Sequence, residues 1–318
     1  MSFADRSSVR WCSLALVFTL AACSAALPIS TTSPASALRF VSHRAVRAQA
    51  AVGVVDGTGK SAILVYATGN EKNKAPFCKI GAAGTYPGAL AVDPNGDLWV
   101  PGGMNSGLDS VVVQYKPSCG PAILTLQDPY AQVSDIAVAQ NGTVYVANAT
   151  TGYGSLGDVL VYPKGRATPS RYLGSHEYFY PYGIAVDSLN NVYVAYDAGT
   201  GSTTGVLVFV NAKGPGRRLK NFRTNEIGSF LFDKNNDLIV SNGSELDIYA
   251  PPYNGEPKAY ALKGQSHQCT LNAAQSTLSC TDSQNESVDV YNYPALTYRY
   301  SFNNGIDGQV SGIAESPL

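Results

Sequence analysis

Charged residues are scarce in this chain, and the lack of basic clusters and of CxxC pairs disfavours nucleic-acid binding and zinc binding. Only 14% of the 318 residues are charged, the net charge is −1, and Lys and Arg form no cluster. Because nucleic-acid binding normally needs a basic stripe, we expect no nucleic-acid partner. The cysteines form no CxxC pair, and the region after residue 49 holds only His176 and His267, so no zinc site is predicted.

Long apolar runs are also lacking, apart from one near the N-terminus. Arg6 and Arg10 precede "LALVFTLAAC", which is about ten residues long and too short for an ordinary transmembrane helix. Its end, Leu20-Ala21-Ala22-Cys23, resembles the bacterial lipobox, in which the peptide is cut before a Cys that carries a diacylglyceryl group. The alternative is a plain secretory signal that is cut nearby, for example after Ala26.

The resemblance to a lipobox divides the chain into three parts. It implies a signal peptide over residues 1–22, a lipid anchor at Cys23, and a place in the bacterial cell envelope; under the alternative the protein is secreted. Residues 24–49 are rich in Ala, Ser, Thr and Pro, so 23–49 are expected to form a flexible tether. The folded domain is then expected over residues 50–318.

The most abundant feature of the folded part is a repeated hairpin, shown by "GIAVDSLNNVYVAYD" at 183–197. An apolar run, a turn rich in Asp and Asn, and a second β-rich run follow one another. A lone hairpin is marginally stable in water, so repetition is needed to cover it. The motif recurs at intervals of roughly 40 to 48 residues, which is typical of a propeller or solenoid. Its first positions are Ala89, Asp135, Gly183, Ser229, Cys269 and Gly312.

Each copy is followed by a second apolar strand that ends in an aromatic residue. These strands include "VLVY" at 159–162 and "VDVY" at 288–291, and weaker fourth strands such as "LTYRYSF" come after them. We expect the terminal rings to pack between adjacent sheets. They are Tyr66, Tyr115, Tyr162, Phe209, Tyr249 and Tyr291.

Four strands in about 45 residues fit a blade of a β-propeller. The "GIAVD…G.VYVA" core and the later "V.VY" strand resemble the NHL-repeat and SMP-30-like propellers, over residues 50–318. The resemblance implies an all-β, six-bladed β-propeller, a fold that hosts enzymes and binding modules alike. The polar-Arg signature of NHL repeats is missing, so their partner binding is not carried over. No blade carries a Trp-Asp pair, which disfavours WD40 repeats.

The two ends of the domain are out of phase with the repeat. "SGIAES" at 311–316 is an inner strand with no partner after it, and "AAVGVVD" at 50–56 is a second strand with no inner strand before it. Because a closed array leaves no free edge, residues 312–315 are predicted to complete the blade that begins at 52–55.

Four cysteines remain in the domain, and an even number in an exported chain suggests disulfides. Cys269 and Cys280 flank the hairpin turn "NAAQS". A two-residue turn would place them opposite each other and allow a bond, whereas a three-residue turn would put them on opposite faces. Cys78 and Cys119 fall at the outer strands of neighbouring blades and could form a second bond.

A polar residue follows the second strand of several blades. A ring of such oxygens could hold Ca²⁺ near the axis, while the structural alternative, which we favour, is that these side chains cap turns. We therefore predict no cofactor, with Ca²⁺ as the open alternative. The residues concerned are Asp56, Asn148, Asn242 and Asp282.

Long loops are predicted on one face of the propeller, opposite the tight hairpin turns, and functional groups normally lie on such loops. The loop "SHEYFYPY" at 175–182 offers several rings beside Glu177, which would suit a sugar or peptide. We therefore expect a monomeric, non-catalytic module that binds a glycan, a peptide or an envelope protein. The candidate ligand-binding residues are Tyr86, Tyr130, His176, Glu177, Tyr178, Tyr180, Tyr182 and His267.

The competing interpretation is an enzyme that resembles SMP-30-type lactonases or streptogramin lyases, with a metal in the central channel. Only Asp135 begins an inner strand with a charge, and its structural interpretation is a solvated strand end. No recognisable catalytic motif surrounds any of the available side chains, so binding is preferred to catalysis. The side chains available to such an enzyme are Asp135, His176, Glu177, Glu226, His267 and Asp307.

Overall fold

The computed structural model shows an all-β chain with one short 3-10 turn, η1 (Val210–Ala212), among the residues that it describes. No helix in this described part is long and apolar enough to cross a membrane. The described residues are 49–55, 59–70, 72–81, 88–102, 111–128, 133–149, 157–174, 180–197, 204–219, 222 and 228–316; the side chains of residues 180 and 204 are not included.

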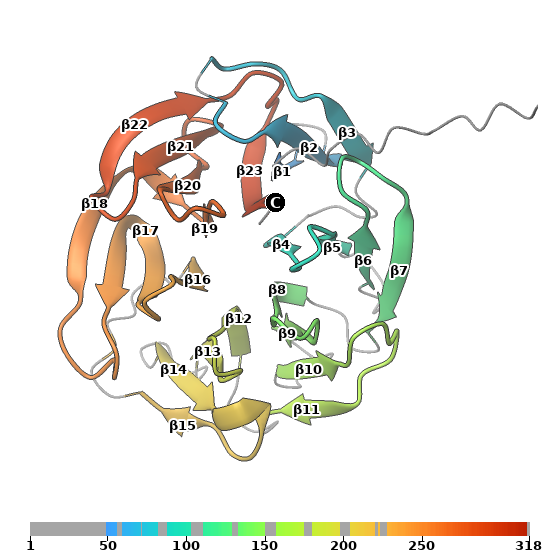
Figure 1. Cartoon of the computed structure of the whole chain (residues 1–318), viewed down its shortest axis with the longest axis vertical. Helices are drawn as coiled ribbons and strands as arrows, with labels where there is room; N and C mark the ends of the chain where they lie inside the picture. The colour runs from blue at the N-terminus through green and yellow to red at the C-terminus, as the bar shows by residue number, and fades with distance from the viewer. Residues whose placement is uncertain are drawn as a thin grey trace, which may run out of the picture. The chain divides into compact units, whose positions relative to one another are not determined.

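The strands form six antiparallel sheets, which surround a common axis as the blades of a propeller (Figure 1). From the axis outward, blade 1 holds β23 (Gln309–Glu315), β1 (Gln49–Val55), β2 (Ser61–Ala67) and β3 (Cys78–Gly81). Blade 2 holds β4 (Ala91–Val92), β5 (Leu98–Gly102), β6 (Val111–Tyr115) and β7 (Ala122–Gln127). Blade 3 holds β8 (Val133–Val138), β9 (Val144–Asn148), β10 (Asp158–Tyr162) and β11 (Arg171–Leu173).

Blades 4 to 6 repeat this order. Blade 4 holds β12 (Tyr180–Val186), β13 (Val192–Asp197), β14 (Thr204–Phe209) and β15 (Arg217–Arg218). Blade 5 holds β16 (Ser229–Phe232), β17 (Leu238–Tyr249) and β18 (Lys258–Ser266); β17 bends back near Gly243, so that its first half pairs with β16 and its second half with β18. Blade 6 holds β19 (Cys269–Leu271), β20 (Thr277–Asp282), β21 (Ser287–Asn292) and β22 (Thr297–Phe302).

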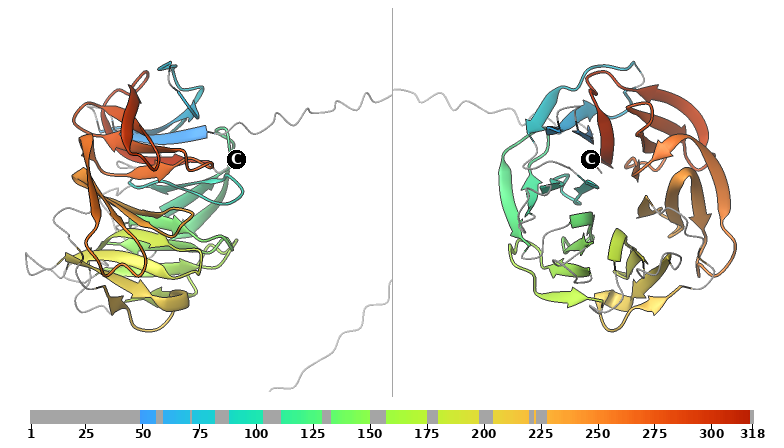
Figure 2. Two further views of the ribbon diagram at one scale, coloured as in Figure 1. Left: turned by 60° about the vertical axis from the view of Figure 1, so that its left-hand side comes forward. Right: turned by 180° about the vertical axis from the view of Figure 1, so that it is seen from behind.

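The ring closes as the phase of the repeats predicts. β23 pairs with β1, with Ile313 opposite Val52 and Gly312 opposite Gly53. The inner strands β4, β8, β12, β16, β19 and β23 also contact one another in succession around the axis, which both faces of the molecule show (Figures 1 and 2). The first blade therefore takes its inner strand from the other end of the chain.

Short Asp-led turns explain why the inner hairpins form. Asp187 Oδ1 accepts hydrogen bonds from the backbone N–H groups of Leu189 and Asn191, at 2.9 and 2.8 Å. Asp93 and Asp233 do the same in blades 2 and 5. The turn then needs a left-handed residue, and Asn190 supplies it with a φ of 63°.

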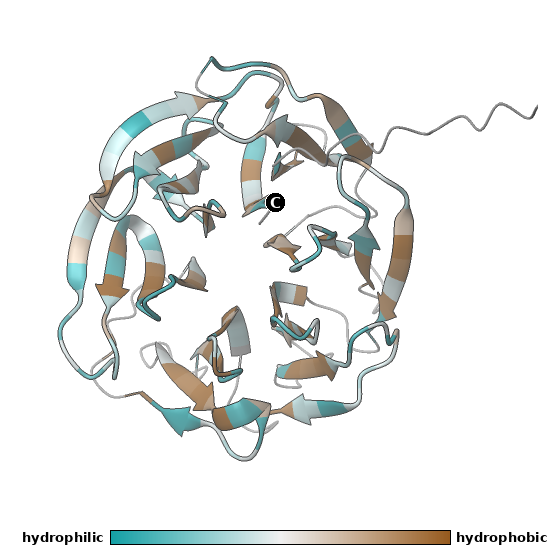
Figure 3. Cartoon of the chain, in the orientation of Figure 1, coloured by the Kyte–Doolittle hydropathy of each residue, from teal (hydrophilic) through white to brown (hydrophobic). Residues whose placement is uncertain are grey.

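The aromatic residues that end the third strands pack between sheets, as predicted. Tyr66, Tyr162, Phe209, Tyr249 and Tyr291 are at most 2% exposed, and Tyr115 is half-buried against the core between blades 1 and 2. Figure 3 shows the third strands β10 and β14 as mainly hydrophobic and the outer strands β15 and β22 as more hydrophilic. The core therefore lies between the blades, with the outer strands facing solvent.

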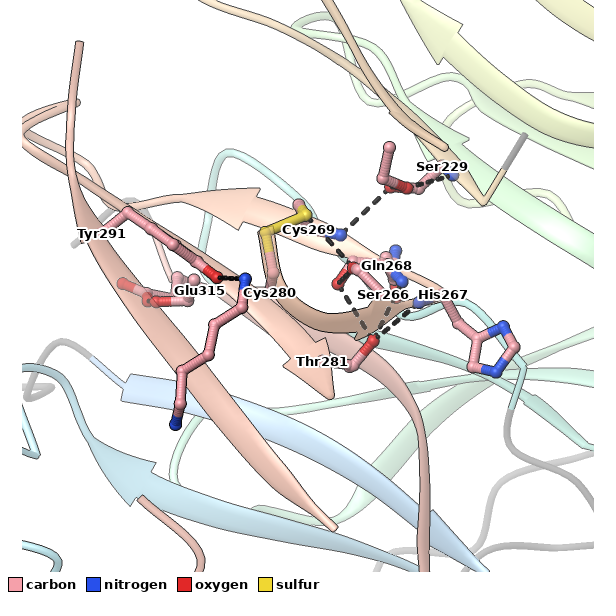
Figure 4. The surroundings of a disulfide bond; sticks show 12 residues. Ser229, Ser266, His267, Gln268, Cys269, Cys280, Thr281, Tyr291 and Glu315 are labelled. Atoms are coloured by element: carbon pink, nitrogen blue, oxygen red, sulfur yellow. Dashed lines mark hydrogen bonds between the residues drawn. A yellow bond between two sulfur atoms is a disulfide. The ribbon is translucent and has the colours of Figure 1, made fainter. Parts of the chain in front are cut away.

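Both predicted disulfides are present. Cys269 lies directly opposite Cys280 and bonds to it, with 4.1 Å between the Cα atoms (Figure 4). The turn that joins their strands runs over 273–276 rather than 274–275, because Asn272 pairs with Thr277. An even number of turn residues keeps both cysteines on one face. Cys78, at the start of β3, bonds to Cys119, which lies in the loop before β7.

Register corrects the repeat alignment in blade 6. Leu278 pairs with Tyr291 as Val144 pairs with Tyr162, so Cys280 is equivalent to Val146. Cys269, which faces Cys280, is therefore equivalent to Ile136, the second residue of its repeat. The first position of the repeat in blade 6 is Gln268 and not Cys269.

Candidate functional site

Polar side chains at the first position of three repeats join neighbouring blades near the axis. Asp135 Oδ2 accepts a hydrogen bond from the backbone N–H of Ile184 at 2.8 Å, and Ser229 Oγ accepts one from that of Cys269 at 3.0 Å. Gln268 Oε1 accepts from the N–H groups of Ile313 and Leu90, and Gln268 Nε2 donates to the carbonyl of Leu90. These groups hold the ring of inner strands together. Figure 4 shows Ser229 and Gln268 beside the disulfide, with the His267 ring turned away.

Asp135 is therefore not the solvated strand end that its position in the sequence suggested. The residue is 3% exposed, and its other oxygen, Oδ1, accepts from the N–H of Ile136 at 2.7 Å. Burial raises the pKa of Asp135 to about 7, while the two backbone hydrogen bonds oppose this rise. Its acceptor atoms serve two backbone amides, which accounts for a carboxyl group at this depth.

The side chains considered as Ca²⁺ ligands serve local structure where the structure describes them. Asp282 accepts hydrogen bonds from the backbone N–H groups of Gln284 and Asn285, and Asn148 Nδ2 donates to Asp158 Oδ1 at 3.1 Å. Asn242 lies at the bend of β17, and Asp56 lies outside the described residues. Over the described ranges, no three His, Cys, Asp or Glu side chains gather as metal ligands would.

Most of the predicted ligand-binding residues lie outside the described part of the chain. Tyr86, Tyr130 and residues 175–179, with His176, Glu177 and Tyr178, belong to this group, and so does Glu226. Tyr180 begins β12, Tyr182 packs half-buried against the core between blades 4 and 5, and His267 is exposed. Asp307 is exposed in the loop before β23. The site on the long-loop face remains a prediction.

A groove lies between blades 3 and 4, on the face that carries the hairpin turns. Its volume is about 600 Å³, and we call it the blade 3–4 groove. Asn141 and Asn190 come from the two hairpin turns, Arg171 comes from β11, and Asn211 and Lys213 come from the loop after β14. Two neighbouring blades thus supply its walls.

Positive charge and amide groups dominate this groove. Arg171 and Lys213 line it, and no Asp or Glu is among its described lining residues. Arg171 Nη2 donates to the carbonyl of Ala212 at 3.0 Å, so the guanidinium spans the gap between the blades. Tyr145 lies beneath it and donates from its hydroxyl to Asn190 Oδ1 at 3.2 Å; burial raises the pKa of this tyrosine, and the Asn190 bond and the charge of Arg171 lower it in part. The groove is suited to an anion.

Little in the sequence points to this groove. Its asparagines read as turn residues, and Arg171 and Lys213 lie 42 positions apart on different blades. The groove lies on the face that was expected to hold short turns, and not on the long-loop face where the sequence predicted a site. The contribution of strand β11 and the 3-10 turn could not be anticipated, because both depend on how adjacent blades pack.

Comparisons with known proteins support the fold alone. A family model described as a beta-propeller repeat matches residues 170–207. Among solved structures, the chain is similar to one titled "Crystal structure of Nidogen/Laminin Complex", with a TM-score of 0.68 and 16% identity over 84% of this chain and 98% of that one. The search of curated proteins gives no match.

Proposed function

We propose that this chain is an exported binding module whose blade 3–4 groove holds an acidic saccharide of the cell envelope. The lipobox-like Leu20–Cys23 segment supports a lipid anchor at Cys23, and the hairpin repeats support a relationship with the NHL and SMP-30-like propellers. Mass spectrometry of the mature N-terminus tests the anchor, since an unmodified residue 23 would contradict it.

The main support for this proposal is the positive charge of the groove. Arg171 and Lys213 line a groove of about 600 Å³ that has no carboxylate among its described lining residues. This volume lies within the usual range of about 300–1,000 Å³ for small-ligand sites. A guanidinium group matches a carboxylate through parallel N–H donors. The cationic pair therefore selects an acidic ligand.

The other lining groups favour a sugar as the carrier of that acid. Each asparagine side chain offers both a donor and an acceptor, which suits neighbouring hydroxyl groups of a pyranose ring. Val210 is 54% exposed at the groove and gives an apolar surface for the C–H face of such a ring. A peptide with acidic side chains is the alternative outcome of the test.

The first prediction concerns this groove. Replacing Arg171 and Lys213 together by Gln should weaken binding of uronic-acid-containing oligosaccharides at least tenfold, because two charge-assisted contacts are lost. A glycan and peptide array followed by calorimetry measures this. Added salt should weaken the binding of the unaltered protein.

The matched control replaces Arg217 and Arg218 by Gln, two exposed residues on β15 that do not line the groove. This control should bind as the unaltered protein does. Equal binding by the groove variant and the control would overturn the proposal. So would a preference for neutral glycans or for peptides.

A further inference from the structure

Two equivalent positions lie at every blade interface. Apolar residues occupy them at five interfaces, and polar residues occupy them at the sixth. At five interfaces, a residue of the second strand and the end of the next blade's inner strand belong to one apolar cluster. Tyr193 and Phe232, for example, have ring centroids 4.8 Å apart. The five pairs are Ala51 with Val92, Trp99 with Val138, Tyr145 with Val186, Tyr193 with Phe232, and Ile239 with Leu271.

At the sixth interface, where blade 6 meets blade 1, the pair is Ser279 and Glu315. Ser279 Oγ donates to Glu315 Oε1 at 2.6 Å. The other carboxyl oxygen, Oε2, is buried and has no hydrogen-bond partner among the described residues. Burial raises the pKa of Glu315 to about 7, and the Ser279 bond lowers it in part.

A pocket lies at this interface. The small side chain of Ser279 stands where other blades carry Trp99 or Tyr145, and a cavity of about 110 Å³ lies at this interface. Glu315, Ser279, Asn70 and Arg299 are among its lining residues. Because one water molecule takes about 30 Å³ of liquid volume, the cavity can hold a small organic group.

A carboxyl group in this position destabilises the interface unless something compensates it. Five apolar pairs show that the fold does not need polarity here, and burying an ionised carboxylate without a partner is unfavourable. We propose that the pocket binds the primary ammonium group of a small ligand through Glu315. An N–H of the ammonium group would donate to the Glu315 carboxylate, which lines the pocket, and a carboxylate on the same ligand would lie toward Arg299.

The second prediction tests this pocket by calorimetry on the whole chain with methylammonium, glycine and neutral acetamide. Methylammonium or glycine should bind saturably and acetamide should not. Affinity should rise between about pH 6 and pH 8, as Glu315 ionises while the amine stays protonated. Tighter binding of glycine than of methylammonium would identify an amino acid as the ligand class.

Two variants make the result decisive. Glu315→Gln keeps the shape and should lower amine affinity at least tenfold. Ser279→Ile with Glu315→Leu copies the Ile239–Leu271 pair of the neighbouring interface, so it should fold, melt at a higher temperature and lose binding altogether. Glu286→Gln, at an exposed site away from the pocket, is the matched control and should bind normally.

Absence of saturable amine binding to the unaltered protein in the millimolar range would overturn the proposal. So would equal binding by Glu315→Gln, which would place the amine elsewhere. The test is independent of the blade 3–4 groove, because neither site shares a lining residue with the other.

Discussion

At the scale of single residues, the buried carboxyl groups of Asp135 and Glu315 have different roles. Asp135 accepts hydrogen bonds at both oxygens from backbone N–H groups of two adjacent blades, whereas Glu315, which lines a pocket, accepts one at Oε1 and has no partner at Oε2 among the described residues. Burial raises the pKa of each to about 7. Both acceptor atoms of Asp135 are accounted for by the fold, whereas Glu315 combines an unpaired acceptor with a place in the lining of a pocket.

The third prediction is that the ionisation of Asp135 makes the stability of the protein depend on pH. Its pKa is about 7 in the folded protein against an ordinary value of 3.8, so the folded state keeps a proton that the unfolded chain releases between these values. The contribution of Asp135 to the unfolding free energy therefore falls as pH rises from about 4 to about 7 and is level above that.

Urea unfolding at about pH 5 and pH 8 measures this contribution. Asp135→Asn should reduce the difference in unfolding free energy between the two pH values, although the variant is less stable at both. Asp307→Asn removes an exposed carboxyl group and should leave the difference unchanged. An unaltered difference in Asp135→Asn would show that the group stays ionised throughout.

At the scale of elements, each inner strand is the edge of its sheet. It pairs with the second strand of its blade on the outer side and, among the described residues, has no strand partner on the side of the axis. Edge strands expose unpaired backbone N–H and C=O groups, and native proteins protect these groups from pairing with other chains. Here side chains from adjacent repeats do so, with Asp135, Ser229 and Gln268 each accepting from the next blade. On the outer side, Tyr66 and Tyr162 donate to carbonyls of the preceding blade, at Asn304 and Gln127.

The fourth prediction concerns Gln268, which connects three blades. Gln268→Ala removes its bonds to Leu90 and Ile313 and leaves buried backbone groups unpaired, so the unfolding free energy should fall by about 2–4 kcal/mol. Chemical denaturation measures the change. Gln265→Ala, an exposed site in the same segment, should change stability by less than about 0.5 kcal/mol. A comparable loss in both variants would mean that Gln268 does not join the blades.

At the scale of the whole molecule, closure of the ring creates features that no single blade contains. The interface of blades 6 and 1 joins β20 to β23, and there the Ser279–Glu315 pair and its pocket arise. Val310, Ile313 and Ala314 of β23 are buried in the cores on either side of blade 1. The last strand is thus both a structural closure and the source of the pocket carboxylate.

The fifth prediction follows from this closure. Deleting residues 309–318 exposes the edge of β1 and removes three buried apolar side chains, so stability should fall by several kcal/mol and aggregation should increase. Thermal unfolding followed by circular dichroism measures the effect. Removing only residues 317–318 keeps the bond from Ser316 N–H to the Gln49 carbonyl and should leave the melting temperature close to its original value. A longer deletion that still melts at the original temperature would contradict closure by β23.

The sequence by itself determined the repeat, the hairpins and the phase at which the ring closes. Alternation of apolar residues and Asp-led turns such as that at Asp187 are local signals, and so is the unmatched strand at each end of the domain. The Cys269–Cys280 bond was also predictable, because two strands joined by a short turn fix which residues face each other.

Only the tertiary structure decided what lies between blades. The first residue of the repeat in blade 6 is Gln268 instead of the predicted Cys269, because strand register and not sequence similarity sets which residues are equivalent. Arg171 meets Lys213 in one groove, and Ser279 meets Glu315 in one pocket, because separate sheets pack side by side. Such contacts depend on distances between blades, which a repeat pattern along the chain does not encode.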